Sequence, residues 1–332
     1  MPKIRSYWTS KSQLQHLSEK SSRRRKILPR LLNFEQLEFR RVLAAPNPFP
    51  LSDLLAANGG DGSDGFVIDG IDEGGRLGIS VNSAGDVNGD GIDDLIVGAE
   101  RAAIPSLPGV NVGQSYVVFG DQNGFPSSVN LTALDGANGF LINGILAGGS
   151  TGSRVASAGD VNGDGVEDLI IGAPDVRSGG NQESGAAYVV FGSREPFPAI
   201  FELAELNGVN GFVLEGIDAG DAFGKSVDGG GDVNNDGYDD VIVGAYNADP
   251  GGNSQAGEIY VIYGKPGTFD ARINVSTLNG SNGFTINGFA PGDRAGLSVS
   301  DAGDVNNDGY ADILIGAEGV DLAGGLNDAG QA

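Results

Sequence analysis

Acidic and amide side chains alternate with other residues in a nine-residue stretch that occurs four times along the chain. The copies begin at Asp86, Asp160, Asp232 and Asp304, which are 74, 72 and 72 residues apart. In every copy position three is Asn, positions five and nine are Asp, and position six is Gly. Side-chain oxygens two residues apart can surround one cation when the chain curls, and glycine at position six permits the sharp turn.

Three carboxylates and an amide per copy are hard oxygen donors, which Ca²⁺ prefers over metals that bind softer ligands. The spacing therefore predicts one structural calcium ion per repeat, up to four in the chain. The predicted ligands are the side chains at positions one, three, five and nine and the main-chain carbonyl at position seven: Asp86, Asn88, Asp90, Ile92 and Asp94; Asp160, Asn162, Asp164, Val166 and Asp168; Asp232, Asn234, Asp236, Tyr238 and Asp240; Asp304, Asn306, Asp308, Tyr310 and Asp312.

Two calcium-binding loops with a similar start are excluded by the residue at position twelve. EF-hand and dockerin-type loops need an acid there, whereas this chain has Val97, Ile171, Val243 or Ile315. An aspartate at position nine that leads directly into an apolar run instead indicates a calcium-binding β-hairpin. The plainer alternative is that Asn-Gly-Asp-Gly is only a favourable turn sequence. A turn, however, needs neither the first nor the ninth aspartate, and all four copies have both.

Strand-like segments surround each loop. A Gly-Phe-x-Ile segment, with Leu214 in place of Ile in the third copy, comes first and alternates apolar with polar residues, which is typical of a strand with one buried face. A Gly-x-Ser-Val-like segment precedes the loop, an aliphatic run that suits a strand buried on both faces follows it, and Tyr-Val-Val-Phe-Gly or a variant closes three of the units. The first kind of segment lies at 65–70, 139–144, 211–216 and 283–288, and the second at 78–81, 152–155, 224–227 and 296–299. The aliphatic run lies at 95–97 and at its three equivalents, and the closing segment at 116–120, 188–192 and 260–264.

These repeats predict an all-β fold, a β-propeller of four-stranded blades, because no unit of this kind can bury both faces of its sheet alone. The repeats cover about residues 50–120, 121–192, 193–264 and 265–332, within a propeller region of residues 46–332. A parallel β-helix is the structural alternative, but its coils are much shorter than this repeat. The fourth repeat lacks its Tyr-Val-Val-Phe-Gly segment, so we expect it to be truncated and the chain to be a fragment or a shortened reading frame.

Charge is distributed unevenly. The first 41 residues contain 11 Lys and Arg and 3 Asp and Glu, whereas the remainder contains 9 and 41, a net charge of −32. So acidic a body repels phosphate backbones, which argues against a nucleic-acid partner.

No run of 18 apolar residues is present, so we expect no transmembrane helix. The only histidine is His16 and there is no cysteine, so neither a catalytic triad nor a His- or Cys-ligated metal site can be built.

Residues 1–45 form a basic segment that we interpret as an export or targeting signal, which we expect to be disordered and not part of the fold. Pro29, Arg30 and Asn33 interrupt the apolar stretch that a standard secretory signal needs. The residues from Leu37 to Ala45 nevertheless resemble the Leu-Glu-Pro-Arg…Leu-Leu-Ala-type stretch that opens many planctomycete exported proteins, with Phe39 in place of the proline. The alternatives are a disordered basic tail or a short amphipathic helix over 31–43.

The repeats also resemble the FG-GAP repeats of the integrin alpha-chain head. Phe223-Gly224 in the third repeat and Gly172-Ala173-Pro174 in the second match the elements after which that repeat is named. The other copies replace Phe or Pro with Leu77, Thr151, Ala295, Glu100, Tyr246 and Glu318. The resemblance implies a propeller, usually of seven blades, in which calcium on one face braces the blade and takes no part in a reaction.

We therefore expect a secreted or cell-surface, calcium-binding propeller scaffold for adhesion or for binding an extracellular protein or carbohydrate, and not an enzyme. Ligands would meet the variable loops 101–113, 175–185 and 246–257, because loops on a rigid scaffold carry recognition. Two alternatives remain open. The chain could be the accessory region of a larger exported enzyme whose catalytic domain lies beyond residue 332, or a spacer without a ligand.

Overall fold

The computed structural model describes residues 50–104, 109–177, 184–322 and 327–332, all within one compact unit. The predicted export segment lies outside these residues. Among the described residues no helix has the length and apolarity needed to cross a membrane. The helical structure of the described residues consists of short 3₁₀ turns: η1 (Leu51–Leu54), η2 (Ala56–Asn58), η3 (Leu131–Ala133), η4 (Leu203–Glu205), η5 (Pro250–Gly252) and η6 (Val275–Thr277).

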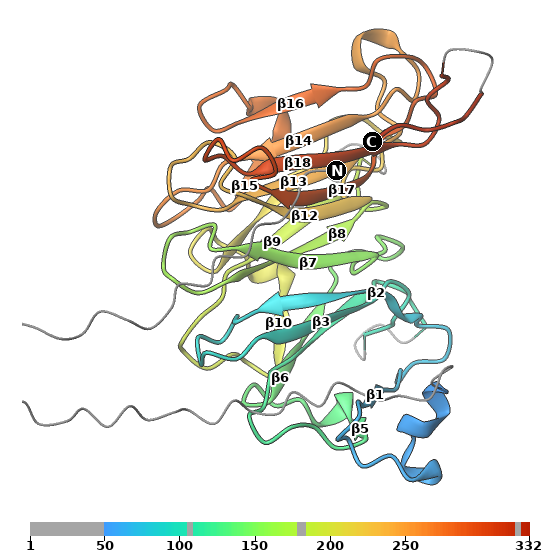
Figure 1. The fold of residues 1–332 in the computed structure, drawn as a ribbon, viewed down its shortest axis with the longest axis vertical. Helices are drawn as coiled ribbons and strands as arrows, with labels where there is room; N and C mark the ends of the chain where they lie inside the picture. The colour runs from blue at the N-terminus through green and yellow to red at the C-terminus, as the bar shows by residue number, and fades with distance from the viewer. Residues whose placement is uncertain (1–49, 105–108, 178–183, 323–326) are drawn as a thin grey trace, which may run out of the picture. The chain divides into compact units, whose positions relative to one another are not determined.

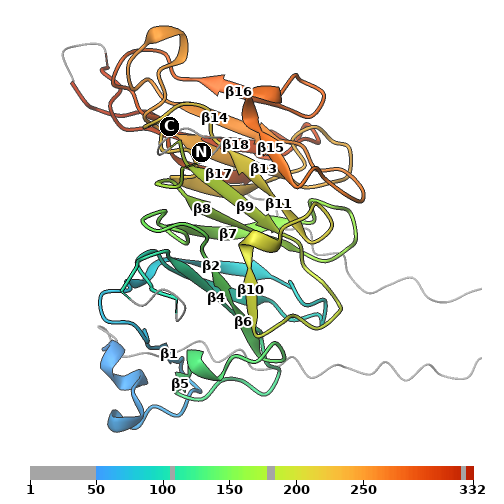
Figure 2. The ribbon, with the colours of Figure 1, turned by 180° about the vertical axis from the view of Figure 1, so that it is seen from behind.

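Successive antiparallel sheets form the blades, which follow one another in chain order (Figures 1 and 2). This arrangement confirms the all-β, propeller-type fold class. Blade 1 contains β2 (Leu77–Gly85), β3 (Asp94–Ala99), β4 (Gln114–Val118) and β6 (Gly139–Asn143). Blade 2 contains β7 (Arg154–Gly159), β8 (Asp168–Ala173), β9 (Ala186–Val190) and β11 (Gly211–Glu215). Blade 3 contains β12 (Ser226–Gly231), β13 (Asp240–Ala245), β14 (Glu258–Ile262) and β16 (Gly283–Asn287), and the described part of blade 4 contains β17 (Ala295–Gly303) and β18 (Asp312–Ala317).

From the second repeat onward, the Gly-Phe-x-Ile segment that opens a sequence repeat is the fourth strand of the blade before it. In blade 1, β6 pairs antiparallel with β4, and Phe140 lies opposite Val117. Strands β11 and β16 hold the same place in blades 2 and 3. The equivalent segment of the first repeat, β1 (Val67–Ile68), pairs with β5 (Ser128–Val129). A blade therefore combines the last three strands of one sequence repeat with the first strand of the next.

A short parallel strand from the following repeat extends the outer edge of blades 1 and 2. Strand β10 (Ile200–Glu202) pairs with β6, and β15 (Arg272–Asn274) pairs with β11. Aromatic stacking holds these additions in place. The rings of Phe140 and Phe197 are nearly parallel with centroids 4.3 Å apart, and those of Phe212 and Phe269 are 4.5 Å apart.

Apolar side chains fill the space between neighbouring blades. Val87 and Ile96 of blade 1 belong to the same buried cluster as Val155 and Ile171 of blade 2. The neighbouring residue Ile170 points to the other side and joins a cluster with blade 3. The aliphatic run of blade 2 is thus buried on both faces, as its sequence predicted, because a blade lies on each side of it.

Candidate metal centre

Each Asp-rich loop joins the first and second strands of a blade, and its carboxylates bond to the main chain of the loop itself. In the first loop Asp86 accepts hydrogen bonds from the N–H groups of Asp90 and Gly91, at 2.9 and 2.8 Å. Asp90 in turn accepts one from the N–H of Ile92 at 2.9 Å. The same three bonds recur in the other loops. The chain therefore curls around the side chains at positions one and five.

The aspartate at position nine ties the loop to the end of the third strand. Asp94 is fully buried, and its two oxygens accept hydrogen bonds from the N–H groups of Val87, at 3.1 Å, and Gly120, at 2.8 Å. The equivalent bonds are present in blades 2 and 3. In the fourth loop Asp312 accepts from the N–H of Val305 and from the side-chain amide of Asn306.

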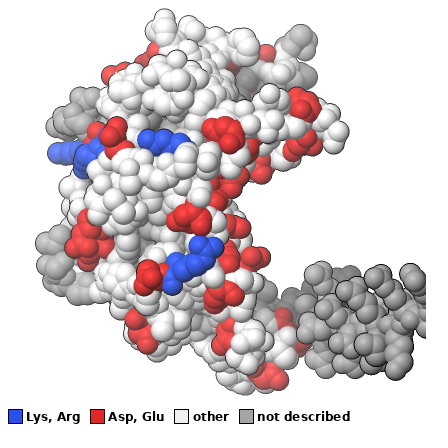
Figure 3. All heavy atoms as spheres, turned by 90° about the vertical axis from the view of Figure 1, so that its left-hand side faces the viewer, with Lys and Arg blue, Asp and Glu red and all other residues white. Residues whose placement is uncertain are grey.

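Negative charge is crowded around position nine. Burial raises the pKa of Asp94 to about 6, of Asp240 to about 7 and of Asp168 to about 8. The main-chain N–H groups oppose this shift in pKa, whereas the charges of the aspartates at positions five and one add to it. The face shown in Figure 3 carries more acidic than basic side chains, and many of the acidic ones border its hollowed side. The environment of the loops therefore favours a cation.

The amide at position three of the third loop has an unused acceptor. The Nδ2 group of Asn234 donates a hydrogen bond to Asp236 at 2.9 Å, while its buried Oδ1 has no hydrogen-bond partner. Leaving such an oxygen unpaired costs about 1–3 kcal/mol, which a cation ligand would avoid. In the part of the chain that the structure describes, no three Asp, Glu or His side chains converge into a metal-binding group by themselves. A cation would therefore need the amide and carbonyl oxygens of positions three and seven as well, a donor set that fits Ca²⁺.

The segments that carry these loops match the family model of the FG-GAP repeat at residues 78–118, 151–190, 223–262 and 297–332. Each matched segment contains one Asp-rich loop between its first two strands. The chain carries four FG-GAP repeats. The resemblance to the FG-GAP propellers of integrin alpha chains, inferred from the sequence, is thereby confirmed.

Curated relatives of the FG-GAP region include two kinds of protein. The chain is 34% identical to phosphatidylinositol-glycan-specific phospholipase D of Bos taurus over 205 residues, 61% of this chain and 22% of the relative. It is 29% identical to integrin alpha-5 of Xenopus laevis over 243 residues, 72% of this chain and 20% of the relative. It is 30% identical to integrin alpha-V of Gallus gallus over 256 residues, 74% of this chain and 20% of the relative. The chain thus spans about a fifth of the length of these relatives.

The residue at position eight, for which the spacing predicted no role, connects neighbouring FG-GAP loops. Asp239 of the third loop accepts a hydrogen bond from the N–H of Asp160, the first residue of the second loop, at 2.8 Å. The N–H of Asp239 donates to the carbonyl of Asp160 at 3.3 Å. Glu167 of the second loop lies in the same way against Gly85 of blade 1. Three loops have an acid here, but the contact joins two different repeats, so the spacing within one repeat does not reveal it.

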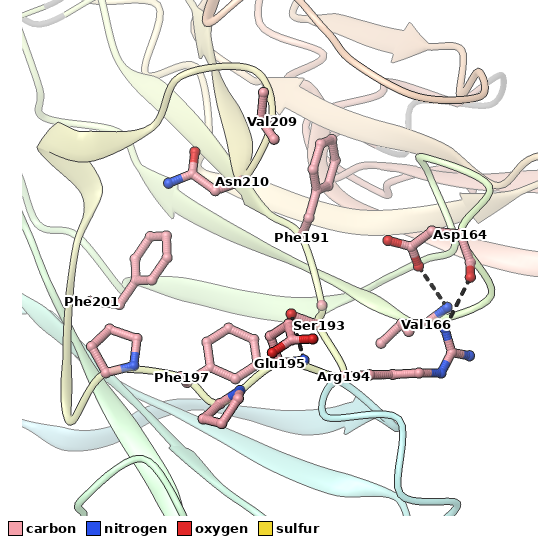
Figure 4. A pocket seen from close by; sticks show the side chains of 13 residues that line it. Asp164, Val166, Phe191, Ser193, Arg194, Glu195, Phe197, Phe201, Val209 and Asn210 are labelled. Atoms are coloured by element: carbon pink, nitrogen blue, oxygen red, sulfur yellow. Dashed lines mark hydrogen bonds between the residues drawn. The ribbon is translucent and has the colours of Figure 1, made fainter.

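A pocket lies beside the FG-GAP loop of blade 2 (Figure 4). Asp164 and Phe191 line it, and the Arg194 guanidinium donates hydrogen bonds to the main-chain carbonyls of Asp164 and Gly165 at 3.2 and 2.7 Å. Pockets occupy the same place in blades 1 and 3, beside the aspartates at position five of their loops. Each of these three blades therefore presents an acidic group next to an aromatic-lined hollow.

Proposed function

We propose that this chain is a calcium-binding FG-GAP scaffold, secreted or at the cell surface, that binds an extracellular protein or a carbohydrate. The observation that carries the calcium proposal is the charge crowding at position nine. In the second loop, burial and the charges of Asp160 and Asp164 disfavour the ionised form of Asp168. A divalent cation among these groups would reverse that penalty, because it favours the ionised carboxylates.

Calcium in this proposal has a structural role. The loop that would hold it connects two strands of a blade, and Asp160 also contacts the neighbouring loop through Asp239. An ion bound there would stabilise one blade and its contact with the next. The chain itself is proposed to be non-catalytic, with ligands bound by the pockets beside the loops and by the variable loops, of which 246–257 is fully described.

Thermal unfolding of the full chain, in millimolar calcium and in excess chelator, tests the calcium proposal. Calcium that binds only the folded chain stabilises it by mass action, about 2.7 kcal/mol at a concentration 100-fold above the Kd. Extracellular sites of this type have a Kd of roughly 10⁻⁴–10⁻³ M, so millimolar calcium should raise the melting temperature clearly. Identical melting curves in both buffers would contradict calcium binding.

The double variant Asp90→Asn with Asp164→Asn separates a metal site from a turn. Asparagine retains the oxygen that accepts the N–H at position seven, so the turn persists. It lacks the carboxylate charge, so the calcium-dependent rise in melting temperature should shrink by up to about half, because two of four sites are weakened. Glu205→Gln, an exposed acid outside the loops, is the matched control and should retain the full rise.

A second function is favoured by one observation, the 34% identity to phosphatidylinositol-glycan-specific phospholipase D over 205 residues. In this alternative the chain is the accessory region of a larger exported enzyme. The scaffold and the accessory region are both non-catalytic in these proposals, so hydrolysis of a phosphatidylinositol glycan by the purified chain would contradict both. Binding of the chain to immobilised phosphatidylinositol glycan favours the accessory region, and binding to other glycans or extracellular proteins favours the scaffold.

A further inference from the structure

Position one of the second loop and position eight of the third loop form a reciprocal contact. The N–H of Asp160 donates to the carboxylate of Asp239 at 2.8 Å, and the N–H of Asp239 donates to the carbonyl of Asp160 at 3.3 Å. The residue before Asp160 is a glycine, and a Cβ atom on Gly159 would lie 2.3 Å from the Asp239 carboxylate. The third loop therefore lies directly against the residue that begins the second loop.

Positions two and three of the second loop are held by the segment that follows the third strand of blade 3. The carbonyl at position two accepts a hydrogen bond from the N–H of Lys265 at 3.0 Å, and the carbonyl of Asn162, at position three, accepts one from Gly267 at 2.9 Å. At the start of that segment, the N–H of Gly264 donates to Asp240, the ninth residue of the third loop, at 2.8 Å. The segment that holds the second loop is thus itself held by a proposed calcium ligand of the third loop.

The junction between the first and second loops is built in the same way. The N–H of Ser193 donates to the carbonyl at position two of the first loop at 2.9 Å, and the N–H of Gly192 donates to Asp168 at 2.9 Å. The stem of Arg194 lies against Gly89, at position four of the first loop, while its guanidinium bonds to carbonyls of the second loop (Figure 4). Both interior junctions therefore connect one loop to the next through short chains of hydrogen bonds.

The sheets that carry the loops leave little room for one loop to move independently of the next. A Cβ atom on Gly172 of blade 2 would lie 2.1 Å from the carbonyl oxygen of Gly224 in blade 3. The pairs that repeat this approach, at 1.9 and 2.0 Å, are Gly98 with Gly152 and Gly244 with Gly296. Because neighbouring main chains are in direct contact, a change in one loop alters the surface on which the preceding loop lies.

We propose that calcium binding at neighbouring loops is coupled, so that calcium in the third loop raises the calcium affinity of the second. Asp239 is the positioning residue, because it connects position eight of one site to position one of the other and is not itself a proposed ligand. The inference rests on the proposed calcium function and adds a mutual regulation of the sites.

Pre-organisation is the physical basis of the coupling. Calcium binding at the third loop orders position eight and the segment that begins at Gly264, and both hold the first three positions of the second loop. The second loop then loses less conformational freedom when it binds its own ion. Coupling is reciprocal, so calcium in the second loop raises the affinity of the third by the same factor. Coupled sites fill over a narrower range of calcium concentration than independent sites do.

Isothermal titration calorimetry of the full chain with calcium measures the coupling. Asp90→Asn with Asp308→Asn disables the first and fourth sites and leaves a two-site chain. Adding Asp236→Asn or Asp164→Asn to it leaves the second or the third site alone. The coupling factor is the product of the two single-site Kd values divided by the product of the two stepwise Kd values of the two-site chain. We expect a factor of at least about five.

Two substitutions of Asp239, each made in the two-site chain and in both single-site chains, separate coupling from a general structural effect. Asp239→Ala removes the acceptor of the Asp160 N–H, so the coupling factor should fall at least about threefold. Asp239→Asn retains an oxygen that can accept this hydrogen bond and should preserve the coupling. Glu205→Ala, an exposed acid outside the loops, is the control and should leave the factor unchanged.

The outcomes distinguish this inference from the proposed function on which it rests. Sites that bind calcium independently in the two-site chain would overturn the coupling and leave the calcium function intact. Full coupling in Asp239→Ala, or its loss in Asp239→Asn as well, would overturn the role assigned to the hydrogen bond of Asp239. Absence of calcium binding by the unmodified chain would overturn both proposals. The melting temperature in excess chelator verifies that each variant is folded.

Discussion

The aspartate at position nine is the residue on which each inner hairpin of the FG-GAP blades depends. In the second loop Asp168 accepts hydrogen bonds from the N–H groups of Val161 and Gly192, at 3.0 and 2.9 Å, and it is fully buried. These two groups belong to different segments, the start of the loop and the end of the third strand. One side chain therefore fixes the loop relative to the sheet, with or without a cation.

Replacing this residue should destabilise the chain even in excess chelator. Asp168→Ala leaves two buried N–H groups unpaired, and we expect a loss of about 1–3 kcal/mol in the free energy of unfolding for each of them. Asp312→Ala is the matched control, since Asp312 is only partly buried and lies in the two-stranded fourth sheet. Urea denaturation measures both, and equal losses would show that burial of the bonds is not the cause.

A second acidic residue, remote from the loops, should make stability depend on pH. Burial, followed by the charges of Asp218, Glu258 and Asp249, raises the pKa of Asp221 to about 6. Because the unfolded pKa is about 3.9, the folded chain holds a proton that the unfolded chain releases between these values. The stabilisation is complete below the unfolded pKa and is lost as the pH rises through 6.

We therefore expect the melting temperature of the unmodified chain to fall relative to that of Asp221→Asn as the pH rises from 4.5 to 7. The asparagine has a similar shape but no titrating charge, so the difference between the two curves isolates this group. Differential scanning calorimetry at half-unit steps of pH measures it. A difference that stays constant over the range would refute the assignment.

At the scale of elements, the outer edge of blades 1 and 2 relies on aromatic packing between repeats. Strands β10 and β15 are three residues long, too short to be stable through their own hydrogen bonds. The stacked pairs of Phe140 with Phe197 and Phe212 with Phe269 anchor the segments that lead into them. The outer strand of one blade is thereby held, through ring stacking, against the chain of the following repeat.

Phe212→Ala should remove this anchor in blade 2. The ring is fully buried, so we expect a loss of about 3–5 kcal/mol in the free energy of unfolding. Phe289→Ala removes a ring that is 93% exposed, and it should change stability by no more than about 0.5 kcal/mol. Chemical denaturation of both variants in calcium provides the comparison, and similar losses in both would contradict the anchoring role of Phe212.

The sequence predicted the strands of the blade but not which blade each one joins. Two local patterns were enough to predict strands. These are the alternation of apolar and polar residues in the Gly-Phe-x-Ile segments and the aliphatic runs after the loops. A periodic pattern determines the length of the repeat, but it can be divided at any residue, so the assignment of β6 to the preceding blade came from the structure. The strands β10 and β15 were not predicted, because their position is set by tertiary stacking and not by local pattern.

The candidate site was predictable to a similar degree. The curled loops were anticipated from alternate oxygens and the glycine at position six, and the hydrogen bonds of Asp86 and Asp90 agree with that curl. The bond between position nine and Gly120 and the contact of position eight with the preceding loop were not anticipated. Both contacts join segments far apart in the sequence, which no spacing rule within the loop can specify.

At the scale of the whole molecule, each blade owes its stability largely to its neighbours. Blades 2 and 3 are covered on both faces, whereas the described part of blade 4 is a two-stranded sheet with one open face. In a linear array of this kind, stability is approximately a sum of unit and interface contributions. The terminal blades should therefore open more readily than the central ones.

Hydrogen exchange of the chain should show this gradient. We expect amides of β18 to exchange at least about tenfold faster than the equivalent amides of β8 and β13, because opening blade 4 breaks one interface and opening a central blade breaks two. Mass spectrometry of peptic fragments resolves the three strands. Equal protection of all three would mean that the blades open only as one cooperative unit.

The glycine-to-glycine approach between blades has a consequence for how such chains change length. Because Gly98 with Gly152, Gly172 with Gly224 and Gly244 with Gly296 form the same joint, the blades are interchangeable modules. Tandem duplication of the coding segment for residues 154–225 would insert a blade whose two sides already match its new neighbours. Blade number can therefore vary through recombination without the evolution of a new interface, and the same property offers protein engineers a cassette for lengthening the array.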